Sequence, residues 1–162
     1  MRFAIALLFA GAVAGAQDAQ DQPETLKVDK EWAGGKTEIT AAEYHRVTDT
    51  EAWHKLWQRH TGKKERAPEV DFDKSMVVAC FLGPVTYDHV TLHAVRKTKE
   101  EILFGMLIEE DDCCDFSTRP QYYMAVVPRS TLKLAIFTRV KEDLDIDPRK
   151  DKLVKEIEEV KE

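Results

Sequence analysis

The pattern of apolar and polar positions predicts one helix in the first half of the chain. Thr48-Asp49-Thr50-Glu51 fits a capping box, in which the Thr48 hydroxyl and the Glu51 carboxylate satisfy backbone amides at the helix start. Gly62 is placed to end the helix in a left-handed cap. Between these signals, one stripe follows at spacings of three and four: Trp53, Leu56, Trp57 and His60. We expect this stripe to pack against a sheet.

Strand patterns separated by short turns occupy most of the remaining chain. The predicted strands are residues 36–47, 75–82, 87–97, 101–109, 121–127 and 132–140. The second is a continuous apolar run typical of a central strand. Thr98-Lys99-Glu100 joins the third and fourth as a hairpin, and Pro128-Arg129-Ser130-Thr131 joins the last two as a second hairpin.

These elements predict an α+β domain over residues 36–141. Its expected form is a mostly antiparallel sheet of about five to six strands packed by one main helix. A parallel sheet would need crossover helices, and the pattern shows none. In the charged extension 142–162, the narrow stripe of Leu153, Ile157 and Val160 indicates a C-terminal helix on the surface. A solvated, frayed helix fits the same stripe equally well.

The N-terminal residues predict export of the protein. Residues 1–16 combine a positive start, a short apolar run and the small residues Ala14-Gly15-Ala16, the pattern of a cleaved secretory signal. The apolar run is too short to span a bilayer, which takes roughly 20 residues. Gln17 follows instead of a cysteine, so the lipid-anchor pattern is missing. Residues 17–35, rich at first in Gln, Asp and Ala, are interpreted as a flexible leader.

Composition narrows the classes of partner. The chain has 162 residues, a length typical of one domain, and a net charge of −6, which removal of Arg2 with the signal changes to −7. Nucleic acids and anionic lipids both bind through Lys and Arg contacts to phosphate. We therefore expect neither as a partner. No second long apolar stretch follows the signal, so we also expect no membrane insertion.

The cysteines do not define a disulfide scaffold, because there are only three. Cys80 lies in the apolar run 75–82 and is most simply a core residue. Cys113 and Cys114 lie in an acidic segment and are the candidate disulfide cysteines. They could close a strained ring, pair elsewhere or stay reduced. In an exported protein we expect an oxidised form, with its connectivity open.

No metal site follows from the sequence spacing. His89 and His93 would stand about 13 Å apart on one strand, whereas nitrogens bound to one zinc ion lie within about 4 Å of each other. The alternating acids of residues 143–147 fail as a calcium loop, because Pro148 occupies the glycine position and Val154 the position of the bidentate Glu. We therefore predict no metal and no cofactor.

Sequence motifs of catalysis are also missing. The chain has no G-x-S-x-G or H-E-x-x-H motif, no P-loop and no Rossmann glycine pattern. Catalytic groups meet in space and not in sequence, so this observation is weak on its own. It nevertheless favours a binding protein over an enzyme.

Three segments together carry a family resemblance: Trp53-His54-Lys55-Leu56-Trp57, residues 68–79 with the order V-D-F before a buried strand, and residues 119–129 with R-P-aromatic and V-P-R. In this order they resemble the PrcB-like family of exported protease-complex accessory proteins, over roughly residues 44–138. The resemblance implies binding and stabilisation of a protease partner, and it brings no catalytic residues. The chain departs from the family in having Pro84-Val85-Thr86 where a glycine pair usually precedes the tyrosine of the third strand.

The leading hypothesis is therefore an exported, non-enzymatic protein-binding domain with a protease as one candidate partner. Its predicted contacts are a sheet edge or the residues Arg119, Pro120, Tyr122 and Tyr123. The alternative is an exported small-ligand or metal-binding protein that uses the 109–115 loop with His89 or His93. An apolar patch beside an open strand edge would favour the first hypothesis, and a concave pocket with converging polar groups the second.

Overall fold

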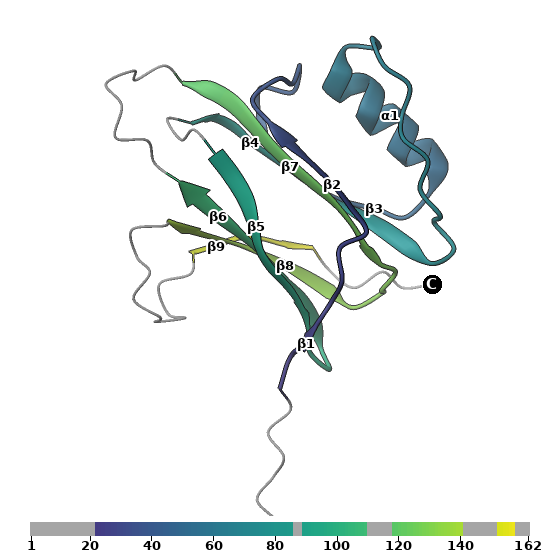
Figure 1. Ribbon diagram of the computed structural model, residues 1–162, viewed down its shortest axis with the longest axis vertical. Helices are drawn as coiled ribbons and strands as arrows, with labels where there is room; N and C mark the ends of the chain where they lie inside the picture. The colour runs from purple at the N-terminus through teal and green to yellow at the C-terminus, as the bar shows by residue number, and fades with distance from the viewer. Residues whose placement is uncertain (1–21, 86–88, 110–117, 141–151, 158–162) are drawn as a thin grey trace, which may run out of the picture.

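The computed structural model of the protein describes residues 22–85, 89–109, 118–140 and 152–157. They form one helix and two sheets, of five and four strands. Figure 1 shows three layers, with the helix α1 on one side of the four-stranded sheet and the five-stranded sheet on its other side. The expected α+β fold with a single sheet is therefore wrong. The chain is mostly β, and its two sheets share one core.

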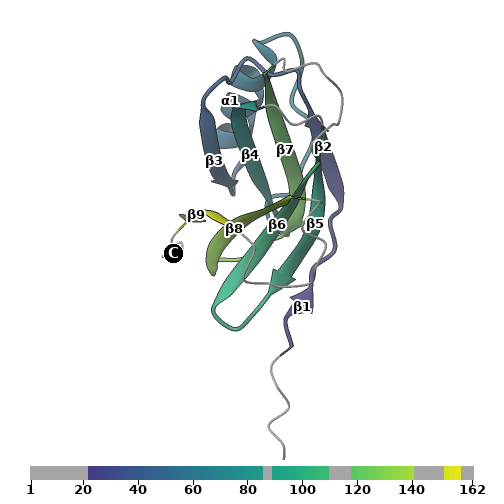
Figure 2. The ribbon, with the colours of Figure 1, turned by 90° about the vertical axis from the view of Figure 1, so that its left-hand side faces the viewer.

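Each sheet combines strands from distant parts of the chain. The five-stranded sheet has the order β1 (Glu24–Thr25), β5 (His89–Lys97), β6 (Glu101–Glu109), β8 (Lys133–Val140) and β9 (Lys152–Ile157). The four-stranded sheet has the order β2 (Lys30–Gly34), β7 (Arg119–Pro128), β4 (Ser75–Val85) and β3 (Ala42–Val47). Figure 2 shows β1 and β2 along the same side of the molecule, where the chain passes from one sheet to the other.

One of the two predicted hairpins is confirmed. β5 and β6 pair antiparallel through residues 89–97 and 101–109. The second hairpin is wrong, because β7 pairs with β2 and β4 while β8 pairs with β6 and β9 in the other sheet. β8 also runs parallel to β6. No crossover helix is needed for this parallel pair, since the chain between β6 and β8 passes through β7 in the opposite sheet.

Two arginines hold the link between β7 and β8. Arg46 of β3 donates to the carbonyls of Leu132 and Thr131. From the link itself, the Arg129 guanidinium donates to the Phe72 carbonyl at 2.6 Å and to the Thr48 carbonyl at 3.0 Å. Hydrogen bonds to charged donors are stronger than neutral ones. The hydrogen bonds of these two arginines therefore fix the link at the point where the chain passes from one sheet to the other.

The core between the sheets is formed by alternate residues of the strands that face each other. Its large, fully enclosed side chains are mostly aliphatic: Met76, Val78, Val95, Ile102, Phe104, Met106, Leu134 and Ile136. Because sheet residues alternate between two faces, the intervening residues of β4 and β7 point away from this core. They meet α1 on the outer face of the four-stranded sheet.

The helix α1 (Thr50–Thr61) lies where the stripe predicts, and its start differs by one residue. Asp49, not Thr48, is the N-cap, because its carboxylate accepts from the Ala52 amide at 2.8 Å. Gly62 ends the helix with a φ of 62°, which confirms the left-handed cap. The stripe residues are buried against the four-stranded sheet, as expected.

Both chain ends contribute strands that the sequence did not predict. Residues 24–25 and 30–34, assigned to a flexible leader, form β1 and β2. The extension expected to be helical contains β9 at residues 152–157, which pairs antiparallel with β8. Ile157 packs against the core between the sheets. Strand pairing with β8 decides the conformation here, because isolated short helices are marginal in water.

Candidate binding site

An aromatic cluster covers the outer face of the four-stranded sheet under α1. Trp53 and Trp57 of the helix contact each other with tilted rings, their centroids 5.1 Å apart, and the Trp32 ring of β2 lies 5.6 Å from each. His60, on the last turn, lies 4.3 Å from the Tyr122 ring of β7 and 5.2 Å from Trp57. The helix and two neighbouring strands are thus joined through ring contacts.

Trp32 is the part of this cluster that sequence reasoning missed. It lies within residues assigned to a leader, and its neighbours on β2 are mostly exposed. Trp32 is the one residue of the edge strand β2 that packs against the apolar cluster under α1, so β2 shows no alternating apolar pattern. The available signal was simpler: the chain has three tryptophans, and all three lie between residues 32 and 57.

A surface hollow of about 790 Å³ opens beside the cluster. Its aromatic side is formed by Trp32, Trp57, His60 and Tyr122. Its other sides are the segment 35–38 after β2 and the segment 64–68 after α1. We call it the aromatic hollow. Tyr122 and Trp32 are half-buried, so they present ring surface to a ligand.

Contacts within the chain fix the walls of the aromatic hollow. The Glu38 amide donates to the His60 carbonyl at 2.9 Å, and the Glu38 carboxylate pairs with Lys64 at 3.0 Å. On the other side, the Trp53 indole N–H donates to the Pro68 carbonyl at 2.8 Å. Gly34 has a φ of 152° and lies under the Tyr122 ring. A ligand would therefore meet a largely formed surface.

Two polar atoms beside the aromatic hollow have no hydrogen-bond partner within the described part of the chain. They are the indole nitrogen Nε1 of Trp57 and Nδ1 of His60. Both side chains are enclosed, at 5% and 4% exposure. Burial lowers the pKa of His60, against a smaller opposing effect of the Glu65 charge, which favours the neutral imidazole. Buried polar groups in proteins are rarely left unpaired, which marks this wall as unusual.

The four predicted contact residues of β7 do not share one surface. Tyr122 lines the aromatic hollow, and Pro120 is half-buried on the same face of the strand. Tyr123 points the other way into the core, is 2% exposed and donates to the Glu31 carboxylate. It therefore presents no surface to a partner. Arg119 is exposed at the start of β7.

Arg119 lines a second, smaller hollow of about 500 Å³ next to the aromatic hollow. Gly34, His89 and Gln121 line it as well, and Gly35 and Lys36 line both hollows. The structure therefore places Arg119 and His89, which belonged to competing hypotheses, in one hollow. His93 is exposed farther along β5, with its ring over Gly105.

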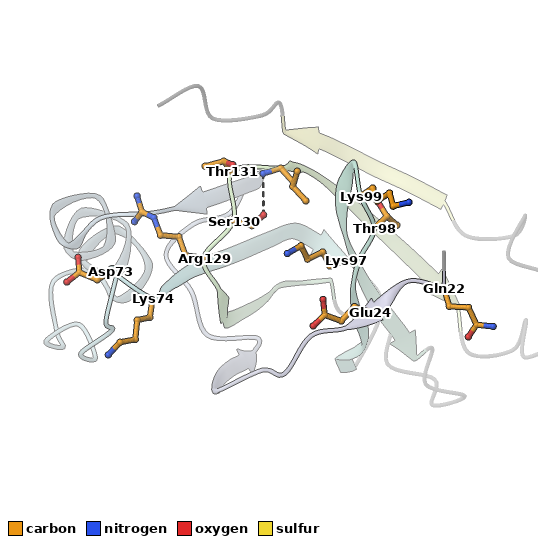
Figure 3. A pocket seen from close by; sticks show the side chains of 11 residues that line it. Gln22, Glu24, Asp73, Lys74, Lys97, Thr98, Lys99, Arg129, Ser130 and Thr131 are labelled. Atoms are coloured by element: carbon orange, nitrogen blue, oxygen red, sulfur yellow. Dashed lines mark hydrogen bonds between the residues drawn. The ribbon is translucent and has the colours of Figure 1, made fainter. Parts of the chain in front are cut away.

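A third hollow, of about 880 Å³, lies between the β7–β8 link and the β5–β6 turn. We call it the basic trough, because it is lined by Lys74, Lys97, Lys99 and Arg129 together with two acidic residues. In Figure 3 its long side chains diverge, with Lys74, Lys99 and Arg129 pointing in different directions. The Ser130 hydroxyl accepts from the Leu132 amide within the link itself. The polar groups of the basic trough therefore do not converge on one point.

The alternative hypothesis of a metal-binding protein gains no support from the described residues. Within the described residues, no three His, Cys, Asp or Glu side chains come together to hold a metal ion. Cys113, Cys114 and most of the 109–115 loop lie outside the described residues. Cys80 is a fully buried core residue, as predicted, and burial raises the pKa of its thiol. It has no thiolate character.

The motifs behind the family resemblance have structural roles. Asp71 accepts from the Asp73 amide at 3.1 Å, which caps the turn before β4 as expected from its position. Phe72 is buried beneath α1, and its carbonyl accepts from Arg129. The V-D-F and V-P-R segments therefore meet and hold the base of the four-stranded sheet.

Comparison of the chain with protein-family models, curated proteins and solved structures finds no match in any of the three. Within the described residues, no helix combines the length and the apolar character that a bilayer span requires. The candidate site therefore rests on its own geometry.

Proposed function

We propose that this chain is an exported, non-enzymatic binding domain that holds a protein partner through the aromatic hollow. The observation that carries the proposal is the pair of half-buried rings, Trp32 and Tyr122, on fixed walls beside the edge strand β2. Tryptophan, tyrosine and arginine are the residues most enriched at the energetic centres of protein interfaces. The resemblance to the PrcB-like family makes a protease the first partner to test.

The surroundings of His60 favour binding over catalysis. General acid–base or nucleophilic catalysis needs an imidazole within hydrogen-bond reach of its partner. The His60 ring instead contacts the rings of Trp57, Phe81 and Tyr122. Its lowered pKa follows from burial among these rings. This environment suits a recognition surface.

The test is capture of the partner from the native envelope fraction by purified protein, followed by reconstitution of the complex from two pure proteins. Tyr122→Ala should weaken the reconstituted complex, because it removes ring surface from the aromatic hollow. Tyr44→Ala is the matched control, since Tyr44 is a half-buried tyrosine at the opposite edge of the same sheet. Equal affinity of the two variants would place the contact elsewhere. Stoichiometric transition metal in the isolated protein, with free thiols at Cys113 and Cys114, would favour the ligand-binding alternative.

Export is tested separately by N-terminal sequencing of the envelope protein. We expect the mature chain to begin at Gln17 or within a residue or two of it, because Ala14 and Ala16 fit the cleavage-site positions. A mature envelope protein that retains Met1 would contradict the signal and reopen the question of an anchor.

A further inference from the structure

The rim of the aromatic hollow is basic, although the chain as a whole has a net charge of −6. Three basic residues, Lys36, Lys64 and Arg66, lie on the two segments that form its walls, and a fourth, Lys63, directly precedes the second segment. Only two carboxylates, Glu38 and Glu65, lie on the same segments. With the adjoining Lys63 included, four basic residues and two carboxylates lie beside the aromatic surface, a local excess of two positive charges.

Most of this positive charge is not used within the fold. Lys64 pairs with Glu38 at 3.0 Å. Lys36, Lys63 and Arg66 are exposed, and no carboxylate in the described part of the chain lies within ion-pair distance of them. On the neighbouring helix α1, by contrast, Lys55 pairs with Glu51 and Arg59 pairs with Glu43. The basic rim is thus distinct from the ordinary charge pairing of the neighbouring surface.

Lys63 is also held in an unfavourable backbone conformation. Its φ of 66° is the only positive value at a non-glycine position in the described residues. The Lys63 amide donates to the Gln58 carbonyl at 2.9 Å, which fixes this conformation at the helix end. Left-handed conformation costs an L-residue roughly 1–2 kcal/mol. A glycine would avoid that cost, and the chain has a lysine there instead.

We propose that the aromatic hollow binds an acidic segment of the protein partner that also carries an aromatic side chain. The aromatic side chain lies against Trp32 and Tyr122, and the flanking carboxylates lie near Lys36, Lys63 and Arg66. This inference rests on the proposed function and adds the chemistry of the bound segment. Charge complementarity with the rim selects an acidic segment over a basic one.

The size and the polar wall of the hollow fit this occupant. Its 790 Å³ lies within the range of roughly 300–1,000 Å³ typical of pockets that enclose a small organic group. The hollow therefore has room for an aromatic side chain together with the residues on either side of it. The segment also brings carbonyl and carboxylate acceptors to a wall where the Trp57 indole N–H has no partner within the described residues.

The test uses a capped pentapeptide of sequence Gly-Asp-Phe-Asp-Gly and three counterparts, in which Asn replaces Asp, Lys replaces Asp, or Ala replaces Phe. Each is titrated to millimolar concentration against the full mature protein, with tryptophan fluorescence and NMR shifts as readouts. We expect saturable binding of the acidic aromatic peptide, weakened roughly tenfold or more in each counterpart and by added salt. No saturation, or equal binding of the Lys peptide, would overturn the proposal.

Charge reversal locates the binding on the protein. Lys63→Glu combined with Arg66→Glu should weaken the acidic peptide roughly tenfold or more. Lys97→Glu combined with Lys99→Glu is the matched control, because it changes the net charge equally at the basic trough. An equal loss of peptide affinity in both double variants would show that the effect comes from net charge alone, which would contradict the inference.

The same variants separate this inference from the proposed function. One outcome is that the reconstituted partner complex survives charge reversal at Lys63 and Arg66 but fails with Tyr122→Ala. In that case the aromatic hollow binds the partner, and the proposal that it binds an acidic segment is wrong. If no protein partner is found at all, the proposed function fails, and the peptide titration alone then decides whether the hollow binds an acidic segment.

Discussion

The aromatic hollow and the basic trough are similar in size and opposite in what their polar groups do. In the basic trough, Arg129 donates to two backbone carbonyls, and the Thr98 hydroxyl accepts from the Glu101 amide at 3.0 Å. Beside the aromatic hollow, two enclosed nitrogens lack hydrogen-bond partners in the described part of the chain, and three basic side chains on the rim have no carboxylate within ion-pair distance there. Volume and positive charge alone would have selected the basic trough.

Polar groups that stabilise the fold differ in this way from polar groups that are free to bind a ligand. Polar groups that pair with their own chain contribute to stability, and their removal is felt in folding. Polar groups and aromatic rings that the fold leaves unsatisfied are available to a ligand. By this criterion the polar groups of the basic trough hold the β7–β8 link in place, and the aromatic hollow is the better candidate for a binding site.

The largest expected effect tests whether the wall of the aromatic hollow is also part of the core. Trp57→Ala should lower the free energy of unfolding by about 3–5 kcal/mol, because it removes an enclosed aromatic side chain that contacts Trp32, Trp53 and His60. Denaturant unfolding of the variant and the parent measures this difference. An unchanged midpoint would mean that α1 does not pack on the sheet as described.

Arg129→Ala tests whether the basic trough stabilises the fold by holding the β7–β8 link in place. We expect a loss of about 2–3 kcal/mol, because the charged donor to the Thr48 and Phe72 carbonyls disappears. Lys97→Ala, an exposed residue of the same trough, should change stability by less than about 0.5 kcal/mol. Acidic-peptide binding should be the same in both variants. Weaker binding in either would give the trough a role in recognition.

A smaller effect is expected from the titration of His60. Because burial lowers the pKa of His60 below its ordinary 6.5, the unfolded chain takes up a proton at a pH where the folded chain does not. The free energy of unfolding should therefore fall as the pH drops below about 6.5 and continue to fall until the folded protein is protonated. Glu65 opposes this shift, and Tyr122 stays neutral in this range because burial raises its pKa.

His60→Phe supplies the comparison for that measurement. It keeps a ring in contact with Tyr122 and removes the titrating group, so its stability should fall less between about pH 7.5 and pH 5.5 than that of the parent. Parallel pH profiles of the two proteins would show that His60 contributes nothing to the acid sensitivity.

The sequence predicted the elements that local signals define. The α1 stripe, its Gly62 end and the β5–β6 hairpin depend on residues close together in the chain, and all three are confirmed. The pairing of β8 depends on residues far away. The four-residue link at 128–131 fits a hairpin turn, yet contacts with Arg46 and Phe72 direct it to the other sheet. No local pattern contains that information.

The candidate site was found only in part for the same reason. Tyr122 was predicted as a contact from the chain, but Tyr123 beside it faces the core, because strand neighbours point to opposite faces. Trp32 lies at the site because β2 pairs with β7, a strand far away in the sequence. The spacing of Leu153 and Ile157 fits a helix, and pairing with β8 makes that segment a strand instead.

The smallest effect separates stability from recognition at one residue. Lys63→Gly should raise the free energy of unfolding by about 0.5 kcal/mol, because glycine adopts a positive φ without the cost that lysine has there, less the extra freedom it gives the unfolded chain. The same change removes a rim charge, so acidic-peptide binding should weaken. Lys99, exposed in the β5–β6 turn, supplies the control: Lys99→Gly should neither raise the free energy of unfolding nor weaken acidic-peptide binding. A Lys63→Gly protein that is more stable and binds as tightly would show that the strained lysine has no part in recognition.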